Sequence, residues 1–299
     1  LDVSELDPFL IPEIVPTFGE QSFLTKQVAE KFGLSAGTPV TYRAGDQPNN
    51  AFSLNVLNPG EIAATAGTSG VVYGVTDKVN HDPYQRINTF AHINHTADHP
   101  RYGVLLCING TGISNSWIKK ITKTSVFELM NQLASAVKPG SEGLLFVPFG
   151  NGAERMLGNS NPGAGFFNID FNLHNHAHLY RAVQEGVAFA FKYGIEIMQQ
   201  TGIDPKLIRA GQSNMFQSEI FGQTLANLTS AEILLCNTDG SLGAARGAAL
   251  GAGFYRSAAE AYQSLSILKT IKPDKIQVLD EAYKLWKKKL SSQLQTFRT

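Results

Sequence analysis

Two segments carry the most information about how this chain folds: Arg43-Ala44-Gly45-Asp46-Gln47-Pro48-Asn49-Asn50 and Thr65-Ala66-Gly67-Thr68-Ser69-Gly70. The first places the carboxylate of Asp46 just after an apolar run that predicts a strand over residues 38–42. The second is a turn of glycines and hydroxyl residues, which can hold a phosphate through its backbone N–H groups. A kinase for small alcohols requires both features, because a base accepts the hydroxyl proton while the turn holds the phosphoryl group.

Each segment also has a purely structural interpretation. Asp46 precedes a helix that Pro48 predicts to run to about residue 56, so its carboxylate could be the N-cap of that helix. The residues Gly67–Gly70 could form the tight turn of a hairpin between strands expected over 61–66 and 71–75. The capping and catalytic roles of Asp46 are compatible with each other.

The rest of the chain alternates helices with strands. Further strands are expected over residues 87–93, 101–108, 144–148, 207–210 and 232–235. Helices are expected over residues 22–32, 112–117, 124–137, 176–201, 217–228 and 242–255. Residues 150–165 are rich in Gly, Asn and Pro and are expected to form a long loop, which is often functional. This order predicts a mixed α/β domain.

Composition limits the class of protein. The 299 residues include 25 basic and 25 acidic side chains, and 43% of them are hydrophobic. This is enough for a large core, and the neutral balance argues against a nucleic-acid partner. No apolar run is long enough to span a bilayer, so no membrane partner is expected. Cys107 and Cys236 lie in apolar runs without metal or redox spacing, which favours the cytoplasm.

Two further patterns could bind a ligand. The histidine groups 174, 176, 178 and 92, 95, 99 have no partner carboxylate at ligand spacing, so we expect structural or solvated histidines and no metal site. Glycines recur from Gly240 to Gly253 in the last expected helix, and each costs about 1 kcal/mol there relative to alanine. Close approach of another helix, or of a ligand, would explain them.

Together these motifs resemble the C-terminal half of the FGGY carbohydrate kinases, and the xylulokinases most closely. The likeness runs from about Pro12 to Tyr255 and follows the order of motifs in the family. The matching segments are Leu34–Val40, Gly45-Asp46-Gln47, Ala66–Gly70, Gly112 with Ser116, Glu154-Arg155, Arg181–Gly186 and Gly240–Ala249. Because the chain starts at Leu1 and contains no match to the family's N-terminal sugar-binding domain, we expect it to be a piece of a longer protein.

The resemblance implies a ribonuclease H-like, actin-like α/β domain in which helices flank a mixed sheet. It implies that residues 1–299 form the C-terminal nucleotide-binding domain, with a core over about 12–256 and a helical tail over 257–299. The implied reaction is ATP-dependent phosphorylation of a ketopentose, D-xylulose to D-xylulose 5-phosphate. The partners are then the sugar, ATP with Mg²⁺ and the missing domain. The polar C-terminal tail also makes a homodimer plausible.

The resemblance also implies roles for individual residues. Asp46 is the catalytic base and contacts the substrate, while Gln47 and Asn49 orient sugar hydroxyls. The turn residues Gly67, Thr68 and Ser69 hold the β- and γ-phosphates. The nucleotide path is lined by Gly112, Ser116, Asn214 and Met215.

The sequence departs from the family at two places. The stretch Ser213-Asn214-Met215-Phe216-Gln217-Ser218 stands where the family has a Gly-Gly-Ala-x-Ser pattern, which changes the adenine contacts. Many relatives also carry an arginine before the glycine that ends the 150–165 loop, where this chain has Ala164. These departures bear on nucleotide and substrate preference.

Two alternatives stay open on the sequence alone. The substrate could be another polyol or ketose, such as glycerol, a fructose-like sugar or a deoxy-ketose. The chain could instead be a non-catalytic, actin-like nucleotide-binding module, although such a module has no need of a base like Asp46. Without the sugar-binding half, this chain on its own is expected to be inactive.

Overall fold

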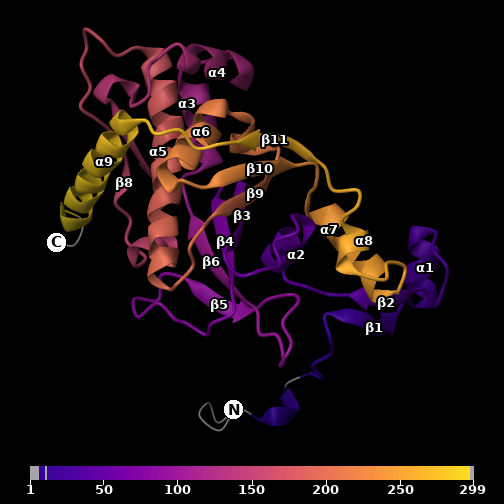
Figure 1. Ribbon diagram of the computed structural model, residues 1–299. Helices are drawn as coiled ribbons and strands as arrows, with labels where there is room; N and C mark the ends of the chain where they lie inside the picture. Colours follow the sequence, from indigo (N-terminus) through magenta and orange to yellow (C-terminus); the bar gives the residue numbers. More distant parts are fainter. Residues whose placement is uncertain (1–6, 11, 297–299) are drawn as a thin grey trace.

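The computed structural model describes residues 7–10 and 12–296; the other residues of the predicted 1–299 domain lie outside the described part. A seven-stranded sheet forms its centre, with strand order β11-β10-β9-β3-β4-β6-β5 (Figure 1). The strands are β3 (Glu61–Ala66), β4 (Gly70–Thr76), β5 (Asn88–Ala91), β6 (Tyr102–Ile108), β9 (Leu207–Gly211), β10 (Glu232–Cys236) and β11 (Ile267–Ile271). Parallel pairs join β9 to β3 and to β10, and the other pairs are antiparallel, so the predicted mixed sheet is confirmed.

The predicted hairpin is also confirmed, and its turn lies where β3 ends and β4 begins. Ala66 of β3 pairs with Gly70 of β4, which leaves residues 67–69 as the turn. On the other side of β4, Gly70 pairs with Ile108, the last residue of β6. The turn and the end of β6 therefore meet at the same end of their strands.

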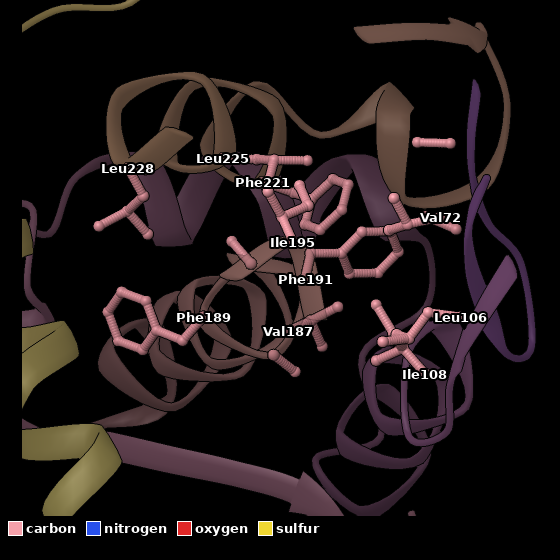
Figure 2. Close-up of a cluster of buried hydrophobic side chains, with 14 of the residues drawn as sticks. Val72, Leu106, Ile108, Val187, Phe189, Phe191, Ile195, Phe221, Leu225 and Leu228 are labelled. Atoms are coloured by element: carbon pink, nitrogen blue, oxygen red, sulfur yellow. The ribbon is translucent and has the colours of Figure 1, made fainter. Parts of the chain in front are cut away.

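Two helices, α5 (His176–Gln200) and α6 (Glu219–Thr229), cover one face of the sheet. Helix α5 begins with a capping box, in which the side chains of Asn175 and His178 and their backbone amides satisfy each other. Figure 2 shows side chains of both helices in one cluster, in which Phe191 points toward Val72 of β4, while Phe189 and Leu228 lie away from the labelled strand residues. Phe191 and Phe221 meet edge to face with ring centroids 5.4 Å apart.

The opposite face carries α2 (Asp46–Ser53), and α7 (Gly240–Gly251) packs against α2. The glycines of α7 lie where other backbone and side chains come very close. An added Cβ would lie 2.7 Å from the Ser53 Cβ at Gly243, 2.7 Å from the Tyr42 ring at Gly247 and 2.0 Å from the Thr41 carbonyl oxygen at Gly251. Close packing against α2 and the strand before it therefore explains this glycine-rich helix.

The first part of the chain forms a two-stranded ribbon of β1 (Phe18–Phe23) and β2 (Pro39–Tyr42), with α1 (Lys26–Phe32) between them. The expected helix over 22–32 starts too early, because Ser22 belongs to β1 and pairs with Val40. Thr25 caps α1 by accepting a hydrogen bond from the backbone N–H of Val28.

A second ribbon and two helices lie beside the main sheet. They are α3 (Gly112–Ile121), α4 (Phe127–Ser135), β7 (Leu145–Phe149) and β8 (Gly163–Phe167). The expected structureless loop over 150–165 is wrong in part, because it contains the 3-10 helix η3 (Glu154–Leu157) and the start of β8. Strand β8 pairs antiparallel with β7, and this pairing orders the end of the segment.

Residues 257–299 were expected to be a helical tail outside the core, and this is wrong for the described part. After the short α8 (Ala258–Ala261), β11 pairs antiparallel with β10 and forms the edge of the main sheet. Helix α9 (Gln277–Thr296) buries a stripe at helical spacing, including Tyr283, Trp286 and Leu290. The Trp286 indole N–H donates to the Phe146 carbonyl oxygen of β7 at 2.8 Å. Helix α9 thus completes the core.

Among the described residues, we found no helix with the length and apolar character needed to cross a membrane.

Candidate nucleotide and substrate site

The phosphate-type turn is attached to the first residues of α3. The Gly112 N–H donates to the Gly67 carbonyl oxygen at 2.8 Å, and the Ile113 N–H donates to the Thr68 carbonyl oxygen at 3.2 Å. A Cβ at Gly112 would lie 2.5 Å from the Gly67 oxygen, so only glycine allows this approach. The positive end of the α3 dipole therefore lies against the turn, which favours an anion there.

A pocket of about 600 Å³ opens beside this junction. Of the residues predicted to bind nucleotide, Gly67, Thr68, Gly112, Ser116, Asn214 and Met215 line it. They come from the turn, from α3 and from the segment before α6, which are far apart in sequence. Ser69 does not line this pocket; its hydroxyl donates to Asn109 Oδ1 at 3.4 Å, beyond the end of β6.

The segment that departs from the family pattern leaves the pocket open. Asn214 begins the short 3-10 helix η4 (Asn214–Gln217) and has a backbone φ of +53°. Glycine and asparagine adopt this left-handed conformation most easily, which accounts for asparagine at a glycine position. Met215 is buried and contributes to the wall of the pocket.

Sequence reasoning missed several other residues of the wall. They are Ile113, Asn115, Phe127, Asn131, Ser213, Gln217 and Ser218. Phe127 and Asn131 belong to α4, an amphipathic helix with no motif of its own. Only the packing of α4 beside α3 and α6 reveals that they face a ligand-sized pocket.

Asp46 is the first residue of α2 and is exposed. The expected N-cap role of Asp46 is wrong, because Gly45 occupies the N-cap position and this helix has no side-chain cap. The Asp46 carboxylate instead accepts from the backbone N–H of Gln47 at 2.7 Å and from the Gln47 side-chain amide at 3.2 Å. A carboxylate in the first turn of a helix interacts favourably with the helix dipole.

Asp46 lies outside the wall of the 600 Å³ pocket, but its charge reaches the neighbouring strand β6. Burial raises the pKa of the Cys107 thiol, and the charges of Glu154 and Asp46 raise it further, while Arg155 opposes them. Cys107 is the residue before the last in β6, so these charges lie near the end of β6 that adjoins the phosphate-type turn. The charge of Asp46 thus acts on a residue of β6 close to the end that pairs with Gly70.

Asn49 and Gln47, the two residues expected to orient the substrate, differ in whether their side chains are available to a ligand. The carboxamide of Asn49 is used at both ends, accepting from the Tyr42 hydroxyl at 3.0 Å and donating to the Gly240 carbonyl oxygen at 2.8 Å. It ties α2 to α7. The Gln47 side chain bonds only to Asp46 in the described part of the chain and is partly exposed.

The histidines take part in structural contacts. His92 is buried, and its ring nitrogens bond the Tyr73 hydroxyl and the Val56 carbonyl oxygen. His178 pairs with the Glu142 carboxylate at 2.9 Å. Over residues 7–10 and 12–296 the structure has no cluster of three or more His, Cys, Asp or Glu that could hold a metal ion.

Comparison with known proteins identifies the family of this chain. The sequence model of the FGGY family of carbohydrate kinases, C-terminal domain, matches residues 62–255. The chain is 27% identical over 247 residues to a gluconokinase of Bacillus subtilis (strain 168), covering 79% of this chain and 47% of that protein. It is 28% identical over 260 residues to a xylulose kinase of Staphylococcus epidermidis, covering 83% and 49%.

The fold agrees as well. The crystal structure of xylulose kinase from Rhodospirillum rubrum matches all of this chain and 60% of that one, with a TM-score of 0.83 at 22% identity. This likeness confirms the predicted actin-like α/β fold. The chain spans about half the length of the curated relatives it matches. It belongs to the FGGY family of carbohydrate kinases, whose C-terminal domain it contains.

Proposed function

We propose that this chain is the nucleotide-binding half of an ATP-dependent sugar kinase whose substrate is a ketopentose, D-xylulose, converted to D-xylulose 5-phosphate. One observation carries the proposal: the turn, the start of α3 and the Asn214–Met215 segment line one pocket of about 600 Å³. A pocket of this size suits a nucleotide. The proposal assigns the role of base to the exposed carboxylate of Asp46, whose charge acts on Cys107 near the end of β6.

In the proposed reaction, the sugar hydroxyl oxygen attacks the γ-phosphorus of ATP and the bond to the β–γ bridging oxygen breaks, releasing ADP. Asp46 accepts the hydroxyl proton, and Gln47 holds the Asp46 carboxylate while contacting the sugar. Gly67, Thr68 and Ser69 hold the β- and γ-phosphates in line. Asn49 holds α2 against α7, and its contact with the sugar stays a prediction.

Mg²⁺ suits this site, because it takes one or two carboxylates together with phosphate oxygens rather than a full protein cage. In this proposal the phosphate oxygens hold most of the ion, and Asp46 stays free to act as the base. When bound, Mg²⁺ would neutralise charge on the phosphates. The sugar contacts that this half lacks would come from the N-terminal domain across a cleft, and closure of the two halves would exclude water.

Two free cysteines support a reducing compartment, the cytoplasm, as the place of action. Self-association into a homodimer stays a prediction.

A second substrate deserves direct comparison. The gluconokinase relative is as similar to this chain as the xylulose kinase relative, which supports D-gluconate as an alternative acceptor. Glycerol, fructose-like sugars and deoxy-ketoses are further acceptors for the same chemistry, and a non-catalytic nucleotide-binding module is the alternative without chemistry.

The proposal is tested in two steps. First, this chain is titrated by calorimetry with a non-hydrolysable Mg²⁺–ATP analogue, with and without D-xylulose. Second, the full-length protein is assayed for ADP release with D-xylulose, D-gluconate and glycerol. Nucleotide binding followed by selective turnover of D-xylulose supports the proposal. No binding at millimolar nucleotide contradicts it, and binding without turnover of any acceptor favours the non-catalytic module.

A further inference from the structure

A carboxamide is buried within the long helix α5. Gln184 lies in α5 and is fully buried, beside the buried Val183 and Val187. Burying a carboxamide is unfavourable unless its donor and its acceptor both find partners. The partners of Gln184 therefore indicate why the polar group is there.

Both partners of Gln184 belong to the wall of the 600 Å³ pocket. The Gln184 Nε2 donates to Asn131 Oδ1 of α4 at 2.9 Å. The Ser218 hydroxyl donates to Gln184 Oε1 at 2.5 Å, while Ser218 Oγ caps α6 by accepting from the Phe221 N–H. Gln184 thus orients two pocket residues from two different helices. With its Oδ1 occupied, Asn131 keeps its Nδ2 donor for a ligand.

A second carboxamide in the same wall lacks a partner. Asn115 is 8% exposed, and its Oδ1 has no hydrogen-bond partner within the described residues. The terminal torsion of asparagine is soft, so rotation can present this acceptor to a donor in the pocket. The wall also has flat or apolar surfaces, Phe127, Ile113 and Met215, against which a planar ring can pack.

We propose that Asn115 and Asn131 read the edge of the nucleotide base and select adenine over guanine, with Gln184 as the positioning residue that sets the polarity of Asn131. This inference rests on the proposed nucleotide site. Adenine offers an amino donor at C6 beside the N1 acceptor, and guanine reverses this order with its O6 acceptor and N1–H donor. An acceptor from Asn115 and a fixed donor from Asn131 match adenine, and they leave unpaired groups against guanine.

The test titrates this chain with Mg²⁺–ADP, Mg²⁺–GDP and pyrophosphate by calorimetry. The variants are Gln184→Met, which keeps the volume and removes both hydrogen bonds, and Asn131→Asp, which replaces the free donor with an acceptor. The matched control is Gln223→Met in α6, because Gln223 also bridges two groups, Asn227 and the Lys272 carbonyl, but lies outside the pocket wall. Thermal unfolding of each variant is measured in parallel.

We expect the unmodified chain to bind ADP at least about tenfold more tightly than GDP. Gln184→Met should reduce this preference at least about fivefold, and Asn131→Asp should weaken ADP at least about tenfold. Pyrophosphate affinity should change less than about twofold in both. The control should lower the unfolding temperature without changing the ADP to GDP ratio.

Equal affinity of the unmodified chain for ADP and GDP overturns the base-reading role and leaves the nucleotide site standing. The same conclusion follows if both pocket variants unfold at lower temperature but keep the ratio. If Gln184→Met does not fold, Asn131→Asp decides, because Asn131 is only partly buried. Failure of ADP, GDP and pyrophosphate alike to bind the unmodified chain overturns the proposed function itself.

Discussion

The backbone N–H of Gly112 donates to the carbonyl oxygen of Gly67 at 2.8 Å, so the first residue of α3 holds the turn between β3 and β4. Two elements separated in sequence by β4, β5 and β6 are thereby fixed to each other beside the pocket. The turn can lie this close to α3 only because residue 112 is a glycine and has no side chain.

Gly112→Ala should therefore weaken nucleotide binding. Its Cβ would lie 2.5 Å from the Gly67 oxygen, which forces the turn away from α3. We expect a loss of affinity of at least about tenfold and a fall in unfolding free energy of about 1–3 kcal/mol. Gly240→Ala is the control, because Gly240 is also the first residue of a helix and its Cβ would make only an ordinary 3.5 Å contact. Unchanged affinity in Gly112→Ala would show that the turn does not hold phosphate.

Asp46→Asn in the full-length protein should reduce phosphoryl transfer by about 10²–10⁴-fold, the range for loss of a general base. Nucleotide affinity should stay within about twofold, because Asp46 lies outside the wall of the nucleotide pocket. The readouts are ADP release and calorimetric titration. Asp98→Asn, at an exposed carboxylate elsewhere, is the control. Turnover near the unmodified value would remove Asp46 from the mechanism.

His92 should make stability depend on pH. Burial lowers the pKa of His92 from 6.5 to about 4, and the neutral ring accepts from the Tyr73 hydroxyl and donates to the Val56 carbonyl oxygen. Between pH 6.5 and 4 the unfolded chain therefore binds a proton that the folded chain does not. Its contribution to stability is full above pH 6.5 and falls by on the order of 3 kcal/mol down to pH 4. Urea unfolding of the chain and of His92→Gln at pH 7 and pH 4.5 measures this, and an equal pH dependence in both would refute it.

Gly251→Ala should destabilise the fold strongly. The added Cβ would meet the Thr41 carbonyl oxygen at 2.0 Å, and backbone cannot move aside as a flexible side chain can. We expect a loss of about 3 kcal/mol or more in unfolding free energy, at the upper end of overpacking effects. Gly240→Ala in the same helix should be close to neutral, and a similar small effect at Gly251 would show that α7 can shift away from β2.

Trp286→Ala should cost about 3–5 kcal/mol of unfolding free energy, because the indole is fully buried and bonds the Phe146 carbonyl oxygen. Leu285→Ala is the control on the same helix, since Leu285 is 46% exposed. Denaturant unfolding compares them. If both substitutions lower the unfolding free energy by equally small amounts, α9 contributes little to the core and is a helical tail as first expected.

The sequence predicted the central elements because their signals are local. The hairpin of β3 and β4 is an example. Its two apolar runs and the glycine and hydroxyl residues of its turn are adjacent in the sequence, so they predict the hairpin without knowledge of the rest of the fold. Strand β11 was missed because its five residues, Ile267–Ile271, mix apolar and polar types without clear alternation. Its partner is β10, and only the completed sheet shows where it belongs.

The site could likewise be predicted only in part. Gly67, Thr68, Gly112, Ser116 and Asn214 could be named from the resemblance to the family, and they do line one pocket, whereas Ser69 does not. Gln184 could not, because a polar residue in a helix usually faces solvent, and its partners lie 53 and 34 residues away. The role of Gln184 becomes visible only in the folded domain, where α4, α5 and α6 pack together.

The last strand and helix also set the order in which a newly made chain can become safe from aggregation. Until β11 leaves the ribosome, the apolar strand β10 presents an unpaired edge to which another chain could add. Until α9 follows, the surface around Phe146 that receives Trp286 stays uncovered. The nascent domain therefore stays open to association with other chains until synthesis passes β11 and α9, however early the hairpin at its centre forms.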